Sequence, residues 1–117
     1  HYEARGGLLW VVYDYHRLVG ALAVVPVPAQ QAAELSKVYL AADHRGRGVA
    51  QHLLQQAEAF ALRAGARRLV LWSDTRFTRA HRFYEKQGFA RVPVARYLAD
   101  VSRTWEYRYE RPLPDPG

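Results

Sequence analysis

The chain has 117 residues, a length that suits one domain with one hydrophobic core and is short for two domains. Half of the residues are hydrophobic and 13% are aromatic, a composition that argues against a disordered chain. There is no cysteine, which excludes disulfides, thiolate metal sites and cysteine nucleophiles. We therefore predict one domain spanning residues 1–117 whose chemistry uses other groups.

The formal net charge of +6 favours an anionic partner, such as a phosphate-rich cofactor, an acidic substrate or nucleic acid. The arginines are spread along the chain instead of forming a tail or an aromatic-interleaved patch, so we expect most of them on solvated surface. No apolar run reaches the roughly 18 to 20 residues that cross a bilayer, and the N-terminus lacks a secretory pattern. We expect a cytoplasmic protein with no membrane partner.

Three strands are predicted in the first third of the chain. Residues 8–15 and 18–25 are rich in strand formers and flank His16-Arg17, the pattern of an antiparallel hairpin. Pro26 and Pro28 are expected to end the second strand, with residues 29–33 as a connection. Residues 34–40 form the third predicted strand, with Glu34 near its start.

Two helices and three more strands are predicted after a glycine-containing turn. The first helix ends near Gly65 and has apolar residues at helical spacing: Val49, Leu53, Leu54, Ala57, Phe60, Ala61 and Ala64. A short apolar run, 69–72, predicts a buried strand, and 78–87 a second helix ended by Gly88. Residues 89–94 and 104–110 complete the strands, with a frayed tail over 112–117. This order predicts an α/β fold with a mixed antiparallel and parallel sheet.

The segment that carries chemistry runs from a strand through a basic glycine turn, Arg45-Gly46-Arg47-Gly48, directly into the first helix. The first turn of a helix has unpaired N–H donors and the positive end of the helix dipole, and glycines let a pyrophosphate approach the backbone. The alternative is that the glycines only permit a turn and the arginines only keep it soluble. The segment is neither a P-loop nor a dinucleotide fingerprint, because the Lys-Ser/Thr ending and the third glycine are missing.

These residues resemble the GNAT superfamily of acyl-CoA-dependent N-acetyltransferases. Arg45, Gly48 and Ala50 match the pattern Arg/Gln-x-x-Gly-x-Gly/Ala of its cofactor loop. A second stretch, residues 80–89 (AHRFYEKQGF), looks like its Ala-x-x-Phe-Tyr-x-x-x-Gly-Phe signature. The resemblance covers residues 34–89 and implies a GNAT-like acyl-CoA N-acyltransferase fold, a central mixed sheet with flanking helices.

The sequence departs from the family pattern in three places. Ala42 stands where many members have proline, and Phe77 where many carry an asparagine that contacts the pantetheine arm, a contact that Ser73 or Thr75 could replace. The N-terminal strand and helices of the family are shortened or missing, since at most seven residues precede the first predicted strand. The domain is therefore either a short member or truncated at its N-terminus, or another subunit completes its site.

The resemblance implies a site for acetyl-CoA. The pyrophosphate would lie on the N–H groups of residues 45–50, and the thioester near Val38 and Tyr39, with the Val38 N–H as the oxyanion donor. The implied cofactor-binding residues are Val38, Tyr39, Leu40, Arg45, Gly46, Arg47, Gly48, Val49, Ala50 and Tyr84.

Two side chains are implied as catalytic. Glu34 is the candidate general base that removes a proton from the acceptor amine, and the alternative is an exposed edge-strand glutamate paired with an arginine. Tyr84 is the candidate proton donor to the leaving thiolate, with a pKa near its free value of about 10. The alternative for Tyr84 is a helix residue that packs in the core beside Phe83.

The remaining polar and aromatic residues predict no metal site. The five histidines do not show a metal spacing, so His44, His52 and His81 are expected on the surface or in loops. Trp72 and Trp105 are expected in the core or in cleft walls, and Trp105 with Tyr107 and Tyr109 could line an acceptor pocket.

The function predicted is acetyl transfer from acetyl-CoA to a primary amine of a small molecule or protein. The first alternative is a catalytically degenerate acyl-CoA-binding domain. The second, based on charge alone, is a basic nucleic-acid-binding module, which lacks a recognisable groove helix or aromatic RNA-binding strand. A homodimer formed through an edge strand is compatible with the sequence, although no residue pattern requires it.

Overall fold

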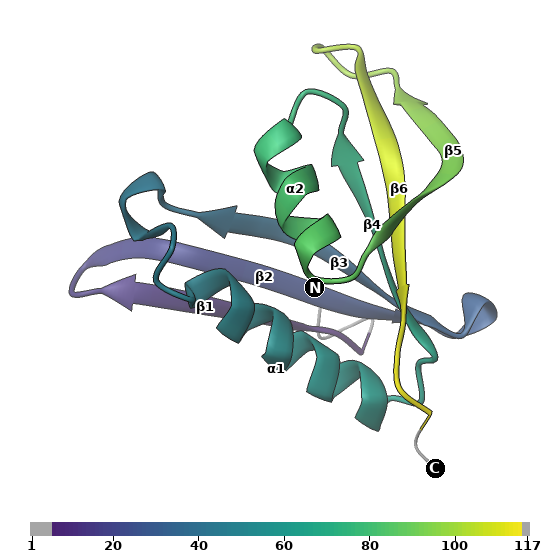
Figure 1. Ribbon diagram of the computed structural model, residues 1–117, viewed down its shortest axis with the longest axis horizontal. Helices are drawn as coiled ribbons and strands as arrows, with labels where there is room; N and C mark the ends of the chain where they lie inside the picture. Colours follow the sequence, from purple (N-terminus) through teal and green to yellow (C-terminus); the bar gives the residue numbers. More distant parts are fainter. Residues whose placement is uncertain (1–5, 116–117) are drawn as a thin grey trace.

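The computed structural model describes residues 6–115 and contains one six-stranded sheet with two α-helices (Figure 1). The strands are β1 (Leu8–Asp14), β2 (Arg17–Val27), β3 (Ala32–Leu40), β4 (Arg68–Asp74), β5 (Ala90–Leu98) and β6 (Thr104–Pro112). The helices are α1 (Val49–Arg63) and α2 (Thr78–Lys86), and the short 3-10 turns are η2 (Pro28–Gln30) and η3 (Ala42–His44).

The strand order is β1-β2-β3-β4-β6-β5, and only the β3–β4 pair among these neighbours is parallel. A parallel pair needs a crossover, which α1 supplies between β3 and β4. The prediction of a mixed sheet with the order β-β-β-α-β-α-β-β is therefore confirmed.

Both helices contribute to one hydrophobic core on the same face of the sheet. Residues 53, 54, 57 and 61 of α1 recur at helical spacing and are buried against the sheet. The core also contains Leu22, Leu35 and Leu71 from three neighbouring strands and Tyr84 from α2. The apolar face predicted for the first helix is confirmed at residues 53, 54, 57 and 61, whereas Ala64 at its end is exposed.

The parallel pair β3–β4 separates part-way along its length. Paired residues run from Ala32↔Arg68 to Leu35↔Leu71, although β3 continues to Leu40 and β4 to Asp74. Two residues further, Lys37 has a left-handed backbone with φ of 54°, and the β2–β3 register shifts there, which makes a bulge. Figure 1 shows the two strands diverging beyond this point.

Two strands continue past their predicted ends at Val25 and Val94. Strand β2 continues through Pro26 to Val27, because β1 is paired only up to Val24 and Pro26 lies beyond that pairing. Strand β5 continues past Val94 to Leu98, because a bulge between Val92 and Ala95 takes up Pro93.

Two further boundaries also differ from the prediction. Strand β3 begins at Ala32, inside the predicted connection, where Ala32 and Ala33 are buried and pair with β4. The C-terminal segment is ordered further than predicted, since Leu113 is buried and its N–H donates to the Arg67 carbonyl at 2.8 Å. The end of the predicted frayed tail, residues 116–117, lies outside the described residues. Within residues 6–115, no helix is long and apolar enough to span a bilayer.

We predict that core stability depends on the sheet face that carries the helices. Leu69→Ala, at a fully buried position, should lower the free energy of unfolding by about 2 to 5 kcal/mol because it leaves a cavity. Leu9→Ala, at a strand position with 47% exposure, is the matched control and should change it far less. Urea denaturation followed by circular dichroism measures both, and equal losses would contradict this assignment of the core.

Candidate functional site

The glycine turn between η3 and α1 forms an open cradle of backbone N–H groups. Gly46 and Gly48 have φ of 79° and 78°, which side-chain-bearing residues rarely adopt, and Gly48 is the N-cap of α1. The His52 N–H makes a helical bond to the Gly48 carbonyl at 2.9 Å, so the preceding N–H groups of the first turn have no intrahelical acceptor. A β-carbon on either glycine would have no neighbour within 4 Å, so the space in front of the turn is open.

The cradle carries positive charge that an anionic ligand could contact. Arg45 and Arg47 are exposed, and neither side chain makes a hydrogen bond or ion pair within the described part of the chain. The helix dipole places further positive potential at the same end of α1. The turn therefore has the donors, the space and the charge that an anionic group requires.

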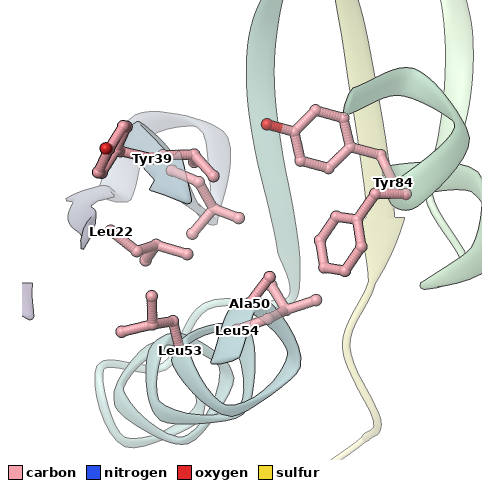
Figure 2. A pocket seen from close by; sticks show the side chains of 9 residues that line it. Leu22, Tyr39, Ala50, Leu53, Leu54 and Tyr84 are labelled. Atoms are coloured by element: carbon pink, nitrogen blue, oxygen red, sulfur yellow. The ribbon is translucent and has the colours of Figure 1, made fainter. Parts of the chain in front are cut away.

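A small apolar groove lies between the strands β2 and β3 and the helices α1 and α2 (Figure 2). Ala50 of the first α1 turn, Val38 and Tyr39 of β3, and Tyr84 of α2 all line it. The remaining lining residues are Leu22, Leu35, Leu53, Leu54 and Phe83. The structure thus brings together four of the predicted site residues, from three elements that are distant in sequence.

Tyr84 is held by its aromatic neighbours and directs its hydroxyl group into the region between the strands. Its ring lies 5.9 Å from those of Phe83, Phe89 and Tyr109, and the residue is 7% exposed. Figure 2 shows the hydroxyl group pointing toward the side on which Tyr39 lies. This hydroxyl makes no hydrogen bond to any residue in the range 6–115. Tyr84 therefore both packs in the core and presents a polar atom at the groove.

Burial changes the acidity of Tyr84 from the expectation. Desolvation, with a smaller contribution from Tyr109, raises the pKa of Tyr84 to about 12, whereas the sequence interpretation placed it near 10. The phenol therefore stays protonated over the whole neutral range and can act as a hydrogen-bond or proton donor.

Glu34 lies on β3 one residue before the last β3–β4 pair, beside Val25 of β2 and Val70 of β4. The alternative interpretation, an edge-strand glutamate paired with an arginine, is wrong, because β3 is an interior strand and Glu34 makes no ion pair among the residues that the structure describes. Side chains alternate along a strand, so Glu34 faces away from the helices while its neighbour Leu35 faces them. Glu34 does not line the groove, and its side chain lies on the opposite face of the sheet.

The expected surface or loop position is wrong for His81, which is buried in α2, whereas His44 lies in the turn η3 but is also buried. His44 and His81 are each 8% exposed, whereas His52 is exposed as predicted. The His81 Nε2 lies 3.0 Å from the Asp74 carbonyl oxygen, and the ring stacks on Tyr109 at 5.4 Å between centroids. The spacing of three residues between His81 and Tyr84, which places both on one helix face, was the signal that could have predicted this burial.

The entry into α2 is fixed by Asp74. Its carboxylate accepts hydrogen bonds from the Arg76 backbone N–H at 2.9 Å and from the Arg76 guanidinium at 2.6 Å. The Asp74 carbonyl also accepts a bond from the Phe77 N–H at 3.0 Å. Arg76 lowers the pKa of Asp74 to about 2. These contacts set the start of the helix that carries Tyr84.

The tryptophans do not line the groove, and the acidic groups form no metal site among the described residues. Trp72 stacks with Arg96 and Arg108, at 4.3 and 5.0 Å from its ring centroid, and Trp105 is 54% exposed beside Tyr97. Within the described range, no three His, Asp or Glu side chains are arranged to hold a metal ion.

Residues 1–89 match the family model described as the acetyltransferase (GNAT) family. This chain belongs to the GNAT family of acetyltransferases. Its sequence is 30% identical over 78 residues to an uncharacterised N-acetyltransferase of Methanocaldococcus jannaschii, covering 66% of this chain and 34% of that protein. The chain thus spans about a third of the length of this curated relative.

Solved structures of this family share the fold. A nourseothricin acetyltransferase superposes with a TM-score of 0.84 at 25% identity, over 92% of this chain and 66% of that one. The PaiA N-acetyltransferase of Thermoplasma acidophilum, solved in complex with coenzyme A, gives 0.73 at 20% identity, over 92% of this chain and 61% of that one. The GNAT-like fold predicted from the two motifs is therefore confirmed.

We predict that Asp74→Ala destabilises the domain by about 1 kcal/mol near neutral pH, because the Arg76 N–H and guanidinium lose their acceptor. The folded-state pKa of Asp74 is depressed, so its stabilisation is present above the ordinary carboxyl pKa of about 3.9 and is lost as pH falls toward 2. Urea denaturation from pH 7 down to pH 3 should show a smaller acid-induced loss in the variant. Glu85→Ala, an exposed carboxylate on α2, is the control, and identical pH profiles for Asp74→Ala and the wild type would contradict the assignment.

Proposed function

We propose that this domain binds acetyl-CoA, or a related acyl-CoA, and transfers the acyl group to a primary amine of a small molecule or a protein. The observation that carries the proposal is the continuity between the anion cradle and the apolar groove, which share Ala50. In an acyl-CoA, a pantetheine arm joins the pyrophosphate to the thioester. The pyrophosphate would lie in the cradle, the arm along the groove and the thioester at the gap between β3 and β4. The family membership of the chain supports the same chemistry.

The cradle would hold the pyrophosphate through backbone donors and two flexible cations. The N–H groups of Gly46, Gly48, Val49 and Ala50 would donate to phosphate oxygens, while Arg45 and Arg47 would supply charge. The open space in front of both glycines is the feature of this structure that fits the group.

Strand β3 would guide the arm and stabilise charge at the thioester carbonyl. Beyond Leu35 it has no pairing with β4, so β4-facing backbone groups of Val38, Tyr39 and Leu40 are available to a ligand. We propose the Val38 N–H as the donor to the oxyanion that develops there. Ser73 lies two residues beyond Leu71, the last β4 residue that pairs with β3. Its hydroxyl group could make the contact with the pantetheine arm that an asparagine makes in many members and that Phe77 cannot make.

Glu34 and Tyr84 would handle the protons from opposite sides of the strand gap. Glu34 would take a proton from the ammonium form of the acceptor, directly or through water, so that the amine can attack the carbonyl carbon. As the C–N bond forms and the C–S bond breaks, Tyr84 would donate a proton to the sulfur. The nitrogen would lose its second proton as the amide forms, and this proton would return through water to the Tyr84 phenolate, while Glu34 would release its proton to solvent. The products are the amide, the free thiol and one proton, so no other reactant is needed.

A primary amine as the acceptor, a homodimer and a cytoplasmic location stay predictions from the sequence. The acceptor would approach from the Glu34 side of the sheet.

We predict that Gly48→Glu abolishes acetyl-CoA binding or weakens it at least tenfold, because it places bulk and negative charge in the cradle. Gly65→Glu is the matched control, since Gly65 also has a positive φ and open space but lies at the other end of α1. Titration calorimetry measures both. Wild-type protein that fails to bind acetyl-CoA would end the proposal, and binding by Gly48→Glu equal to that of Gly65→Glu would remove the cradle from it.

We predict that Tyr84→Phe lowers the rate of thiol release by about 10²- to 10⁴-fold without weakening acetyl-CoA binding, because only the proton donor is lost. The assay follows free thiol with an amine that the wild type accepts. Tyr109→Phe, at a neighbouring buried tyrosine outside the groove, is the control and should retain most activity. Unchanged turnover in Tyr84→Phe would mean that Tyr84 only packs.

A further inference from the structure

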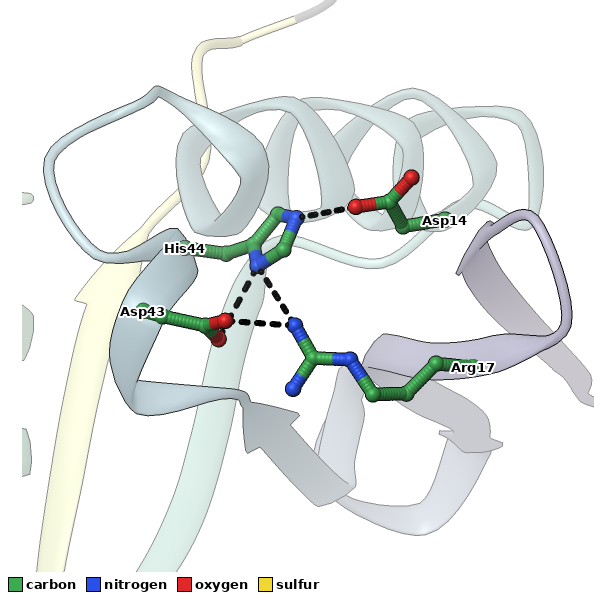
Figure 3. Close-up of polar contacts among 4 residues, drawn as sticks. All are labelled: Asp14, Arg17, Asp43 and His44. Atoms are coloured by element: carbon green, nitrogen blue, oxygen red, sulfur yellow. Dashed lines mark hydrogen bonds and ion pairs between the residues drawn. The ribbon is translucent and has the colours of Figure 1, made fainter.

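Four polar side chains join the end of the β1–β2 hairpin to the turn η3 (Figure 3). The His44 Nε2 lies 3.2 Å from the Asp14 carboxylate, and the His44 Nδ1 lies 3.1 Å from that of Asp43. Arg17 donates to Asp43 at 2.6 Å, and its guanidinium lies 3.5 Å from the His44 Nδ1. We call these four residues the clasp.

The imidazole of His44 is the buried centre of the clasp. Its side chain is 11% exposed, whereas those of Asp14, Arg17 and Asp43 are 47%, 54% and 63% exposed. Carboxylates only accept hydrogen bonds, so the bond to Asp14 requires a hydrogen on the Nε2. With that hydrogen in place, the Nδ1 can accept from Arg17 or, when protonated, donate to Asp43. The hydrogen bond from the His44 Nε2 to Asp14 on the hairpin can therefore form whether the imidazole is neutral or protonated.

The clasp holds a segment that has few backbone anchors. Before it, the Ala41 N–H donates to the Val19 carbonyl at 2.8 Å, and after it the His52 N–H makes a bond to Gly48. Between them, the His44 N–H donates to the Ala41 carbonyl at 3.0 Å and the Arg45 N–H reaches the Ala42 carbonyl only at 3.4 Å, and both of these bonds are local to the turn. Ala42 also leaves the backbone torsion free, where a proline would fix it. Side-chain contacts of the clasp are therefore the tertiary anchor of the residues that lead into the cradle.

The clasp also adjusts the charge next to the cradle. Asp43 is ionised at neutral pH, since its hydrogen bonds from Arg17 and His44 lower its pKa to about 2. An uncompensated carboxylate two residues before Arg45 would oppose an incoming phosphate. Arg17 neutralises it and draws it toward the hairpin.

We propose that the clasp pre-organises the cradle for the pyrophosphate of an acyl-CoA, with His44 as a positioning residue that does not touch the ligand. The proposal rests on the acyl-CoA function given above. Exposed ion pairs contribute little to global stability, so the main effect of the clasp is local. A cradle already held in its binding conformation has less ordering to lose when the ligand binds.

The test compares a ligand that has the pyrophosphate with one that lacks it. Coenzyme A is titrated by calorimetry and pantetheine by NMR shift changes, each against the wild type and three His44 variants. His44→Ala should weaken coenzyme A binding roughly tenfold or more, the equivalent of one hydrogen bond to a charged group. Pantetheine affinity should not change.

Two amide substitutions at His44 distinguish the role of the Nε2 from that of the Nδ1. His44→Gln places an N–H near the former Nε2 and should keep the bond to Asp14 and most of the affinity. His44→Asn places it near the former Nδ1, loses Asp14, and should resemble His44→Ala. Glu106→Gln, which alters the 2.7 Å pair with Arg96 on β5, is the control for loss of a surface ion pair and should bind like the wild type.

The outcomes separate this inference from the function on which it rests. A wild type that does not bind coenzyme A overturns both. Normal coenzyme A binding by His44→Ala overturns the clasp and leaves the function standing. Equal weakening for coenzyme A and pantetheine, accompanied by a lower melting temperature, shows a general structural role and also overturns it.

Discussion

The separation of β3 and β4 after Leu35↔Leu71 is the constraint on which the site depends. Up to that pair, the two parallel strands bury Leu35, Leu69 and Leu71 under both helices and form the centre of the core. Beyond it, each strand continues with a neighbour on its outer side only, β2 for β3 and β6 for β4. The same core that stabilises the sheet therefore ends at an edge where backbone donors, an apolar groove and Tyr84 meet.

The bulge at Lys37 shows how the sequence sustains this opening. A residue in the left-handed region costs energy when it is not glycine, so the surrounding structure must hold it there. Strand β2 does so by pairing on both sides of the bulge, at Ser36 and at Tyr39. The strain is thus located beside Val38, the residue whose N–H the proposed mechanism uses.

Pairing of charges divides the arginines into two groups. On the sheet face away from the helices, Arg68 pairs with Glu110 and Arg96 with Glu106, at 2.7 Å in both cases. Arg45 and Arg47 have no such acidic partners among the residues described. Several described arginines have no acidic partner, and Arg45 and Arg47 place two of these positive charges at the cradle. Composition alone predicted only that most of them would be solvated.

The sequence by itself determined the order of elements, the helix faces and the two motifs that lead to the family. These features are local, because helical spacing, a glycine turn before a helix and short apolar runs depend on residues close together in the chain. The continuation of β2 through Pro26 and of β5 through Pro93 could not be predicted this way, since a proline is tolerated where pairing on one side stops or a bulge takes it up.

Only the tertiary structure decided what surrounds the candidate site residues. The burial of His44 depends on Asp14, thirty residues away, and the raised pKa of Tyr84 depends on rings contributed by Phe89 and Tyr109. The position of Glu34 on the sheet face opposite the helices follows from the packing of its neighbour Leu35 in the core, because side chains alternate along β3. Burial, hydrogen-bond partners and desolvation are set by contacts between distant segments, which the order of residues along the chain does not specify.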